Sequence, residues 1–298
     1  MTESQTDLMA TPIGHVAETT FNSLTVAILL TAEGAFIDGF AYFGHGHVFA
    51  NVMTANLVLS AVSCVHGDWP RAARLLLPVA SYLAGVLIGA MLKSWTKKWA
   101  TANPQALAIG IAIAILIGVG WLPAGFSSAA IVSIISFGNA VRSFFFLRVE
   151  RWNYASTLPT GNLRQFGEAI FQLLSEMDNP KSKRQAMVFG SITVSFFLGA
   201  LAGGVATNIL HNRAVWVAAL LLLAALARGI FVQSSTVPRV RLSNFVLGIV
   251  ALISSISCLA LTEREPTIHF SHPTVSPVMT YDENVEYLAG GRFSHPLA

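Results

Sequence analysis

The sequence predicts an all-α integral membrane protein, and three observations lead to this prediction. Of the 298 residues, 54% are hydrophobic and only 11% are charged, and the mean hydropathy is +0.61. Soluble domains carry about 25% charged residues, so the composition is typical of membrane proteins. No charged residue occurs between Lys98 and Arg142, and this stretch allows two crossings because one helix needs about 20 apolar residues. A short polar motif also occurs twice in apolar surroundings.

Six apolar segments follow one another along the chain. They are residues 24–44, 74–92, 106–122, 126–147, 186–210 and 214–232. A further segment, residues 245–261, is a candidate seventh span, although it is rich in serine. Residues 1–23 form an N-terminal tail without Lys or Arg, which differs from a secretory signal. Residues 262–298 form a polar C-terminal tail with little apolar periodicity.

The repeated motif places an acid or an amide about twenty residues before a Thr-small-Asn-Leu sequence. Its residues are Asp38, Thr54 and Asn56 in the first copy, and Asn139, Thr160, Gly161 and Asn162 in the second. Each copy is followed by a helix with a Gly-x-x-x-Gly sequence, which predicts close helix packing. These glycines are Gly85 and Gly89 in the first copy and Gly199 and Gly203 in the second. The duplication therefore predicts two membrane repeats, residues 24–122 and 126–232.

The segments that hold the motifs, residues 48–65 and 152–174, fit the scheme of simple spans poorly. If each enters and leaves the membrane on one side, eleven Lys and Arg residues of the connections lie on the N-terminal side and three on the other. If both cross fully, the division is seven against six. The positive-inside rule favours the first topology, with the N-terminus in the cytoplasm. Each repeat then has three spans plus a re-entrant or broken helix, and the two repeats are inverted.

Charged and amide residues inside the apolar segments are the candidate functional residues. A carboxylate at membrane depth needs a partner or a polar cavity. Arg142 is a candidate ion-pair partner for Glu33 or for Asp38, while the alternative for Arg142 is an anchor at the membrane interface. The Thr and Asn residues of the motif have two interpretations. They cap a helix that restarts after a break, or they bind a solute at that helix N-terminus.

Several functions are not expected. The sequence contains no nucleophile–base set, Walker motif or dinucleotide fingerprint, so we expect neither enzyme activity nor a cofactor. His45 and His47 have no third ligand nearby in sequence, so no metal site is predicted. The net charge is +3, but the basic residues lie between the apolar segments, where they act as topology determinants. Nucleic-acid binding is therefore not expected.

The sequence also resembles a known family at the motif residues. These are Ile37-Asp38-Gly39, Val48-Phe49 through Met53-Thr54-Ala55-Asn56, Gly138-Asn139-Ala140 and Thr160-Gly161-Asn162. In this order they resemble the YoaK-like family of bacterial membrane proteins, a family of unknown function. The resemblance covers roughly residues 24–232, and Ala55 stands where the family has glycine. It implies a multi-pass protein of the bacterial inner membrane with no settled substrate.

Two functions remain open at this point. In the leading hypothesis, the motif residues line a cavity between the repeats that binds or moves a small polar solute or ion. In the alternative, the chain is a structural or assembly protein whose tail or helix faces dock a partner. The expected partners are the lipid bilayer, a small polar solute or ion, and a second copy of the chain or another membrane protein.

Overall fold

The computed structural model describes residues 21–98, 103–123, 125–154, 159–175 and 179–236, all within one compact unit, Met1–Val250. This part of the chain is mostly helical, as the sequence predicts. Its strands are the two-residue β1 (Arg148–Val149) and β2 (Trp152–Asn153), which pair antiparallel. The candidate seventh span at 245–261, the C-terminal tail at 262–298 and residues 1–20 of the N-terminal tail lie outside the described residues.

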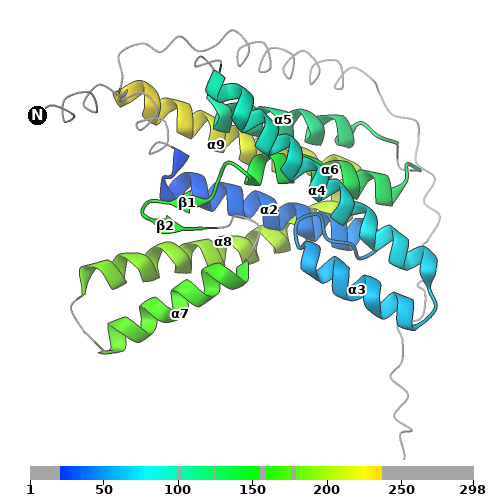
Figure 1. Cartoon of the computed structure of the whole chain (residues 1–298), viewed down its shortest axis with the longest axis horizontal. Helices are drawn as coiled ribbons and strands as arrows, with labels where there is room; N and C mark the ends of the chain where they lie inside the picture. The colour runs from blue at the N-terminus through cyan, green and yellow to red at the C-terminus, as the bar shows by residue number, and fades with distance from the viewer. Residues whose placement is uncertain (1–20, 99–102, 124, 155–158, 176–178, 237–298) are drawn as a thin grey trace, which may run out of the picture. The chain divides into compact units, whose positions relative to one another are not determined.

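Helices occupy the six predicted spans and both motif segments (Figure 1). They are α2 (Leu24–Gly44), α3 (Met53–Val65), α4 (Trp69–Lys98), α5 (Pro104–Gly120), α6 (Ser128–Ser143), α7 (Pro159–Ser175), α8 (Pro180–Leu210), η2 (His211–Ala214) and α9 (Val215–Thr236). Two of the starts are encoded locally, because Asn103 and Asn179 accept backbone N–H bonds just before the proline that begins α5 or α8. Asparagine caps a helix well, and proline suits the first position because its missing N–H would have no partner there.

Within the described residues, three stretches are long and apolar enough to cross a membrane: Leu24–Gly44, Trp69–Thr96 and Pro180–Phe231. With 17 and 16 residues, α5 and α6 are shorter and reach about 25 Å across a hydrocarbon core of about 30 Å. Of the three stretches α2 is the most enclosed, because 67% of its most apolar 18 residues are buried, against 22% for α4. Large apolar side chains stay exposed along α4 and α8, among them Leu83, Leu87, Phe197 and Leu201. Such faces are suited to lipid contact.

The predicted packing glycines lie at helix contacts. In Figure 1, α2 and α8 lie side by side, and a Cβ atom at Gly199 or Gly203 would overlap the backbone of α2. On α4, a Cβ atom at Gly85 would overlap the Phe137 carbonyl of α6, and Gly89 faces the Phe144 ring. Glycine at these positions lets the helix axes approach more closely than any side chain would allow.

Contacts between side chains at the helix ends fix the helix directions. The rings of Phe21 and Phe146 lie 6.1 Å apart at the start of α2 and the end of α6, while His45 Nδ1 lies 3.3 Å from Ser128 Oγ at the opposite ends. We call these the N-terminal end and the distal end of the helices. Because α2 and α6 run in opposite directions, α3 follows a helix that ends at the distal end, and α7 follows one that ends at the N-terminal end.

The helices that come after α3 and α7 complete this arrangement. Lys93, near the end of α4, lies over the Phe144 ring at the N-terminal end, so α4 begins at the distal end. Arg184, in the second turn of α8, forms an ion pair with Glu150, whose backbone N–H donates to Asn22 O. This contact places the start of α8 at the N-terminal end. Each motif helix therefore connects two helices, one ending and one beginning at the same end of the fold.

Candidate functional site

The Glu33 and Arg142 side chains form an ion pair between α2 and α6. Glu33 Oε2 lies 2.7 Å from Arg142 Nη2, and both side chains are 0% exposed. The contact is close in distance but is not aligned as a hydrogen bond, and the Nε and Nη1 atoms of Arg142 have no hydrogen-bond partner in the described part of the chain. Arg142 thus pairs with Glu33 and not with Asp38, and its full burial is incompatible with an anchor at the membrane interface.

Asp38 holds a loop that turns back along α2. Its Oδ1 atom accepts hydrogen bonds from the Ala50 N–H at 3.0 Å and the Asn51 N–H at 2.8 Å. The Asn51 side-chain amide donates to Gly34 O at 2.9 Å. Gly34 is the middle of the 21-residue helix α2, so Asn51 contacts α2 about 15 Å from either helix end. The non-helical residues 45–52 therefore reach mid-height of a candidate membrane span.

The turn that redirects this loop has a local cause. Gly46 has φ +80° and His47 has φ +57°, so two consecutive residues adopt the left-handed conformation just after α2. Glycine adopts this conformation without steric cost, while His47 is strained there. The preceding His45 ring packs on Phe40, with ring centroids 4.6 Å apart. Burial lowers the pKa of His45 from 6.5 to about 4, because a buried imidazole loses the hydration that favours its charged form.

Asn56, in the first turn of α3, is bound entirely within its own loop. Its Oδ1 accepts from the Phe49 N–H at 2.9 Å, and its Nδ2 donates to Phe49 O at 2.7 Å. The side-chain amide thus gives the Phe49 backbone the two hydrogen bonds that a neighbouring strand would otherwise provide. Asn56 is 0% exposed. Its partner in the motif, Thr54, is exposed. The first copy of the motif therefore fixes the loop before α3, but it does not cap the helix as the capping interpretation expected, because the cap residue is Val52 and no side chain caps α3.

The second copy of the motif is divided in a similar way. Asn162 in α7 is buried and takes part in a contact, whereas Thr160 and Gly161 are exposed. Asn139 is buried on α6, one turn before Arg142, and its Nδ2 atom has no hydrogen-bond partner among the described residues. Asn139 therefore belongs with the buried ion pair, and Thr160 and Gly161 do not.

Sequence analysis missed two members of the buried polar group. Asn51 was not singled out, although it binds Gly34 and its Oδ1 atom has no partner in the described part of the chain. Ser136 is also fully buried, with an unpartnered hydroxyl. Its spacing of three and six residues before Asn139 and Arg142 places all three on one helix face, so helical periodicity could have found it. No sequence signal indicated Asn51.

These side chains form a group that we call the polar core. It consists of Glu33, Asp38, Asn51, Ser136, Asn139 and Arg142, contributed by α2, the following loop and α6. Asp38 and Glu33 interact electrostatically as well. With both acids ionised the polar core carries two negative charges and one positive charge. Among the described residues, no partner is found for acceptor atoms of Asp38 and Asn51 or for donor nitrogens of Asn139 and Arg142.

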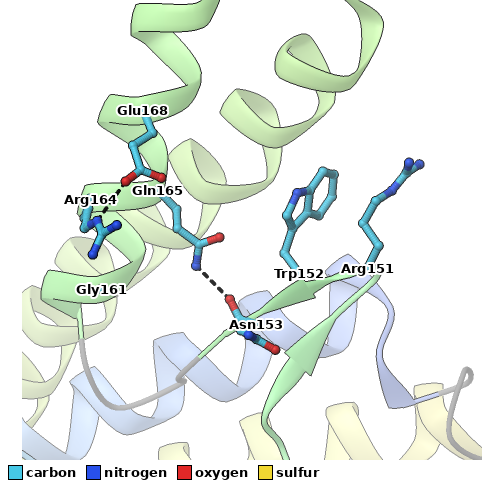
Figure 2. A pocket seen from close by; sticks show the side chains of 7 residues that line it. All are labelled: Arg151, Trp152, Asn153, Gly161, Arg164, Gln165 and Glu168. Atoms are coloured by element: carbon cyan, nitrogen blue, oxygen red, sulfur yellow. Dashed lines mark hydrogen bonds and ion pairs between the residues drawn. The ribbon is translucent and has the colours of Figure 1, made fainter.

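The described residues contain no group of three or more His, Cys, Asp and Glu side chains that could hold a metal ion. An open cleft of about 520 Å³ lies elsewhere, between the β1–β2 hairpin and the first half of α7. Its lining residues are Arg151, Trp152, Asn153, Gly161, Arg164, Gln165 and Glu168 (Figure 2). Of the residues predicted from the sequence to bind a solute, Gly161 alone lines this cleft.

The fold and the polar core define a class: a mostly helical chain with stretches long enough to cross a membrane and an enclosed cluster of charged and amide side chains. Residues 26–228 match the family described as "Protein of unknown function (DUF1275)", and the chain belongs to this family. No curated protein and no solved structure matches the chain.

Proposed function

We propose that this chain is a multispan membrane protein that binds or moves a small polar solute or ion at its polar core. The observation that carries the proposal is the set of buried polar atoms in the polar core that have no hydrogen-bond partner among the described residues. Leaving one such atom unpaired costs about 1–3 kcal/mol. Several of them on α2, its following loop and α6, both donors and acceptors, suit a guest that completes their hydrogen bonds. Polar groups inside membrane segments commonly mark solute or ion pathways.

The broken loop supports the same proposal. Non-helical backbone at membrane depth occurs only where protein buries it or where it lines a water-filled cavity. In this chain Ala50 and Asn51 reach mid-height of α2, and their N–H groups bind Asp38. Interrupted helices near the membrane midplane form the binding sites of many transporters. One oxygen of Asp38 is thus occupied by the loop, and its Oδ2 is available to a guest.

We further propose that the chain is a YoaK-like protein of the bacterial inner membrane and that α2–α5 and α6–α9 are two inverted repeats. The contacts support this assignment because α2 packs on α8 and α9, while α6 packs on the corresponding α4 and α5. The motif helices α3 and α7 join long helices at opposite ends of the fold. The excess of basic residues at the N-terminal end supports a cytoplasmic N-terminus in this proposal, and the proposed activity is not enzymatic.

A structural or assembly role is the second candidate function, and one specific observation favours it. Both polar atoms of the Asn56 side chain are used by Phe49, so this motif residue has no free group for a solute. In that role the polar core would only fix the broken loop, and a partner would dock on the tail or on a helix face. The two candidate functions differ in whether the unpartnered atoms of the polar core are needed for activity.

A flux experiment distinguishes the two candidates. The full chain is reconstituted into proteoliposomes, and the flux of H⁺, Na⁺, K⁺, Cl⁻, urea and neutral amino acids is compared with that of protein-free vesicles. Ser136→Ala removes a hydroxyl that no described residue binds, so we expect normal insertion but at least tenfold slower flux. The matched control is Ser195→Ala, which removes a buried hydroxyl that donates to Ile192 O in its own helix.

Asp38 offers a second test with an internal control. Asp38→Asn keeps an oxygen for the two loop N–H groups and loses the charge and the Oδ2 acceptor, whereas Asp38→Ala loses both. We expect Asp38→Asn to insert normally and to abolish flux. The transport proposal is wrong if no solute of the panel crosses faster than in protein-free vesicles, or if both Asp38→Asn and Ser136→Ala leave flux unchanged.

A further inference from the structure

Asp38 is the acid of the polar core without a partner of opposite charge among the described residues. Glu33 is neutralised by Arg142 at 2.7 Å, whereas the charged side chain that acts on Asp38 is Glu33, which has the same sign. In the loop after α2, His47 is exposed and His45 packs on a ring. The charged residues of α8 and α9, which pack on α2, lie near the N-terminal end; they are Lys181, Lys183, Arg184 and Arg228. An enclosed carboxylate without a countercharge is costly, and a proton neutralises it.

Asn51 contacts Asp38 with both its backbone and its side chain. The Asn51 N–H donates to Asp38 Oδ1 at 2.8 Å, and the Asn51 side-chain amide also interacts with the carboxyl group. The remaining oxygens, Asp38 Oδ2 and Asn51 Oδ1, are acceptors without a hydrogen-bond partner in the described part of the chain. Two acceptors can pair only through a hydrogen that lies between them, and a protonated carboxyl group has one O–H donor. A single proton on Asp38 Oδ2 would therefore complete both atoms.

The enclosure of these two oxygens limits the size of what they can hold. Asp38 is 4% exposed and Asn51 is 2% exposed, and neither unpartnered oxygen has a water-sized space beside it. Cations such as Mg²⁺ and Ca²⁺ take about six or more oxygen ligands, whereas a proton needs one oxygen to carry it and one to accept the hydrogen bond. The arrangement therefore suits a proton.

Other polar side chains continue from Asp38 along the same face of α2. Positions 27, 31, 34, 38 and 45 follow one another at intervals of three, four or seven residues, so they share one helix face. Thr31 Oγ1 is hydrogen-bonded to the Tyr154 hydroxyl, which donates to Ala27 O at 2.8 Å towards the N-terminal end. His45 lies at the distal end of this face. Chains of Asp, Glu and His side chains form the proton relays of pumps and transporters, and hydroxyl groups can extend them because each donates and accepts.

We propose that the ion handled by the polar core is the proton, which is held on Asp38 Oδ2, is shared with Asn51 Oδ1 and moves along this face of α2. Uptake forms the O–H bond of a neutral carboxylic acid, and release of the proton leaves the carboxylate, so no other reactant is consumed. Thr31 and Tyr154 lie between the site and the N-terminal end, and His45 lies on the way to the distal end. The inference rests on the proposed function, because it names the ion of the same site.

Infrared spectroscopy of the purified full chain in lipid tests where the proton resides. A protonated carboxyl group has a C=O stretching band that a carboxylate lacks. We expect this band at neutral pH in the unaltered chain and its loss in Asp38→Asn, which keeps the shape of the neutral acid. The matched control is Asp68→Asn, which changes an exposed carboxylate and should keep the band.

Proton flux is measured in proteoliposomes with a pH gradient, using a trapped pH-sensitive dye and valinomycin with K⁺ to cancel the membrane potential. We expect the full chain to pass protons faster than protein-free vesicles and Asp38→Asn to abolish the difference. Thr31→Val keeps the shape of the side chain and should slow proton flux about tenfold, as expected for the loss of one hydrogen bond. The matched control is Thr193→Val, which removes a hydroxyl that donates to Phe189 O within its own helix and should leave the flux unchanged.

The inference is overturned if the unaltered chain lacks the carboxylic acid band at neutral pH or if Asp38→Asn keeps it. It is equally overturned if Asp38→Asn leaves proton flux unchanged or if Thr31→Val and Thr193→Val pass protons at the same rate. Asp38-dependent flux of Na⁺ or of another solute without proton flux would overturn the inference and leave the transport proposal standing. If no solute of the panel crosses faster than in protein-free vesicles, the transport proposal fails and this inference fails with it.

Discussion

Replacing Glu33 by glutamine would leave the Arg142 guanidinium enclosed without a counter-charge. Both side chains are 0% exposed, and the charged atoms lie 2.7 Å apart. Arginine keeps its charge inside proteins, so it cannot escape by losing a proton. Removing one member of a buried pair costs about 3–5 kcal/mol, and glutamine matches the shape of glutamate, so little cavity energy is added. We therefore expect Glu33→Gln to lower the free energy of unfolding by about 3–5 kcal/mol.

The assay is unfolding of the purified chain in mixed micelles by increasing sodium dodecyl sulfate, followed by far-ultraviolet circular dichroism. Combining Glu33→Gln with Arg142→Met removes both charges, and neutral replacements of a buried pair are often tolerated. The double variant should be more stable than Glu33→Gln alone. As a control, Arg164→Gln breaks a solvent-exposed pair and should cost less than about 1 kcal/mol. Additive effects of Glu33→Gln and Arg142→Met, or a loss below about 1 kcal/mol for Glu33→Gln, would refute this reasoning.

Three further predictions concern packing, the broken loop and pH. Gly203→Ala should lower stability by about 1–3 kcal/mol because its Cβ overlaps α2, whereas Gly204→Ala meets open space and should be neutral or stabilising in the same denaturant series. Asn56→Ala leaves the N–H and C=O groups of the half-buried Phe49 without their partner and should cost about 1–3 kcal/mol, while limited proteolysis should cut the loop faster. The pKa of His45 is about 4 in the folded chain and 6.5 as its ordinary value, so the unfolded chain takes up the proton first as the pH falls. The folded state therefore keeps its full stability above about pH 6.5 and loses part of it between pH 6.5 and 4. Melting curves of His45→Gln should lack this pH-dependent loss.

The helices could be predicted from the sequence because their signal is local. A run without charge from Lys98 to Arg142 can be satisfied in a membrane protein only by apolar helices, and α5 and α6 occupy it. The packing role of Gly203 followed from its spacing to Gly199. A carboxylate in an apolar helix needs a partner of opposite charge, and the sequence indicated Arg142 as a candidate. Its choice of Glu33 over Asp38 depends on the path of the loop after α2, which no residue pattern reveals.

The motif threonines show a different reason for failure. Residues two apart on a helix lie about 200° apart around its axis. Thr54 and Asn56 both belong to α3, and Thr160 and Asn162 both belong to α7, so the two members of each pair cannot face the same cavity. In each pair the asparagine is buried and the threonine is exposed. This geometry could have been predicted from the sequence if each motif had been placed inside its helix. The sequence interpretation placed the motif at the helix start.

The structural and the functional interpretations of the motif become compatible when each polar atom, and not each residue as a whole, is assigned a role. Asp38 Oδ1 is committed to the broken loop, and both amide atoms of Asn56 are committed to Phe49. Committed atoms explain why an acid and an amide are needed even if nothing is transported. Asp38 Oδ2 and the Asn139 amide nitrogen have no such commitment among the described residues. A purely structural role gives no reason to bury these groups unpaired, which is costly, whereas the proposed polar guest would give one.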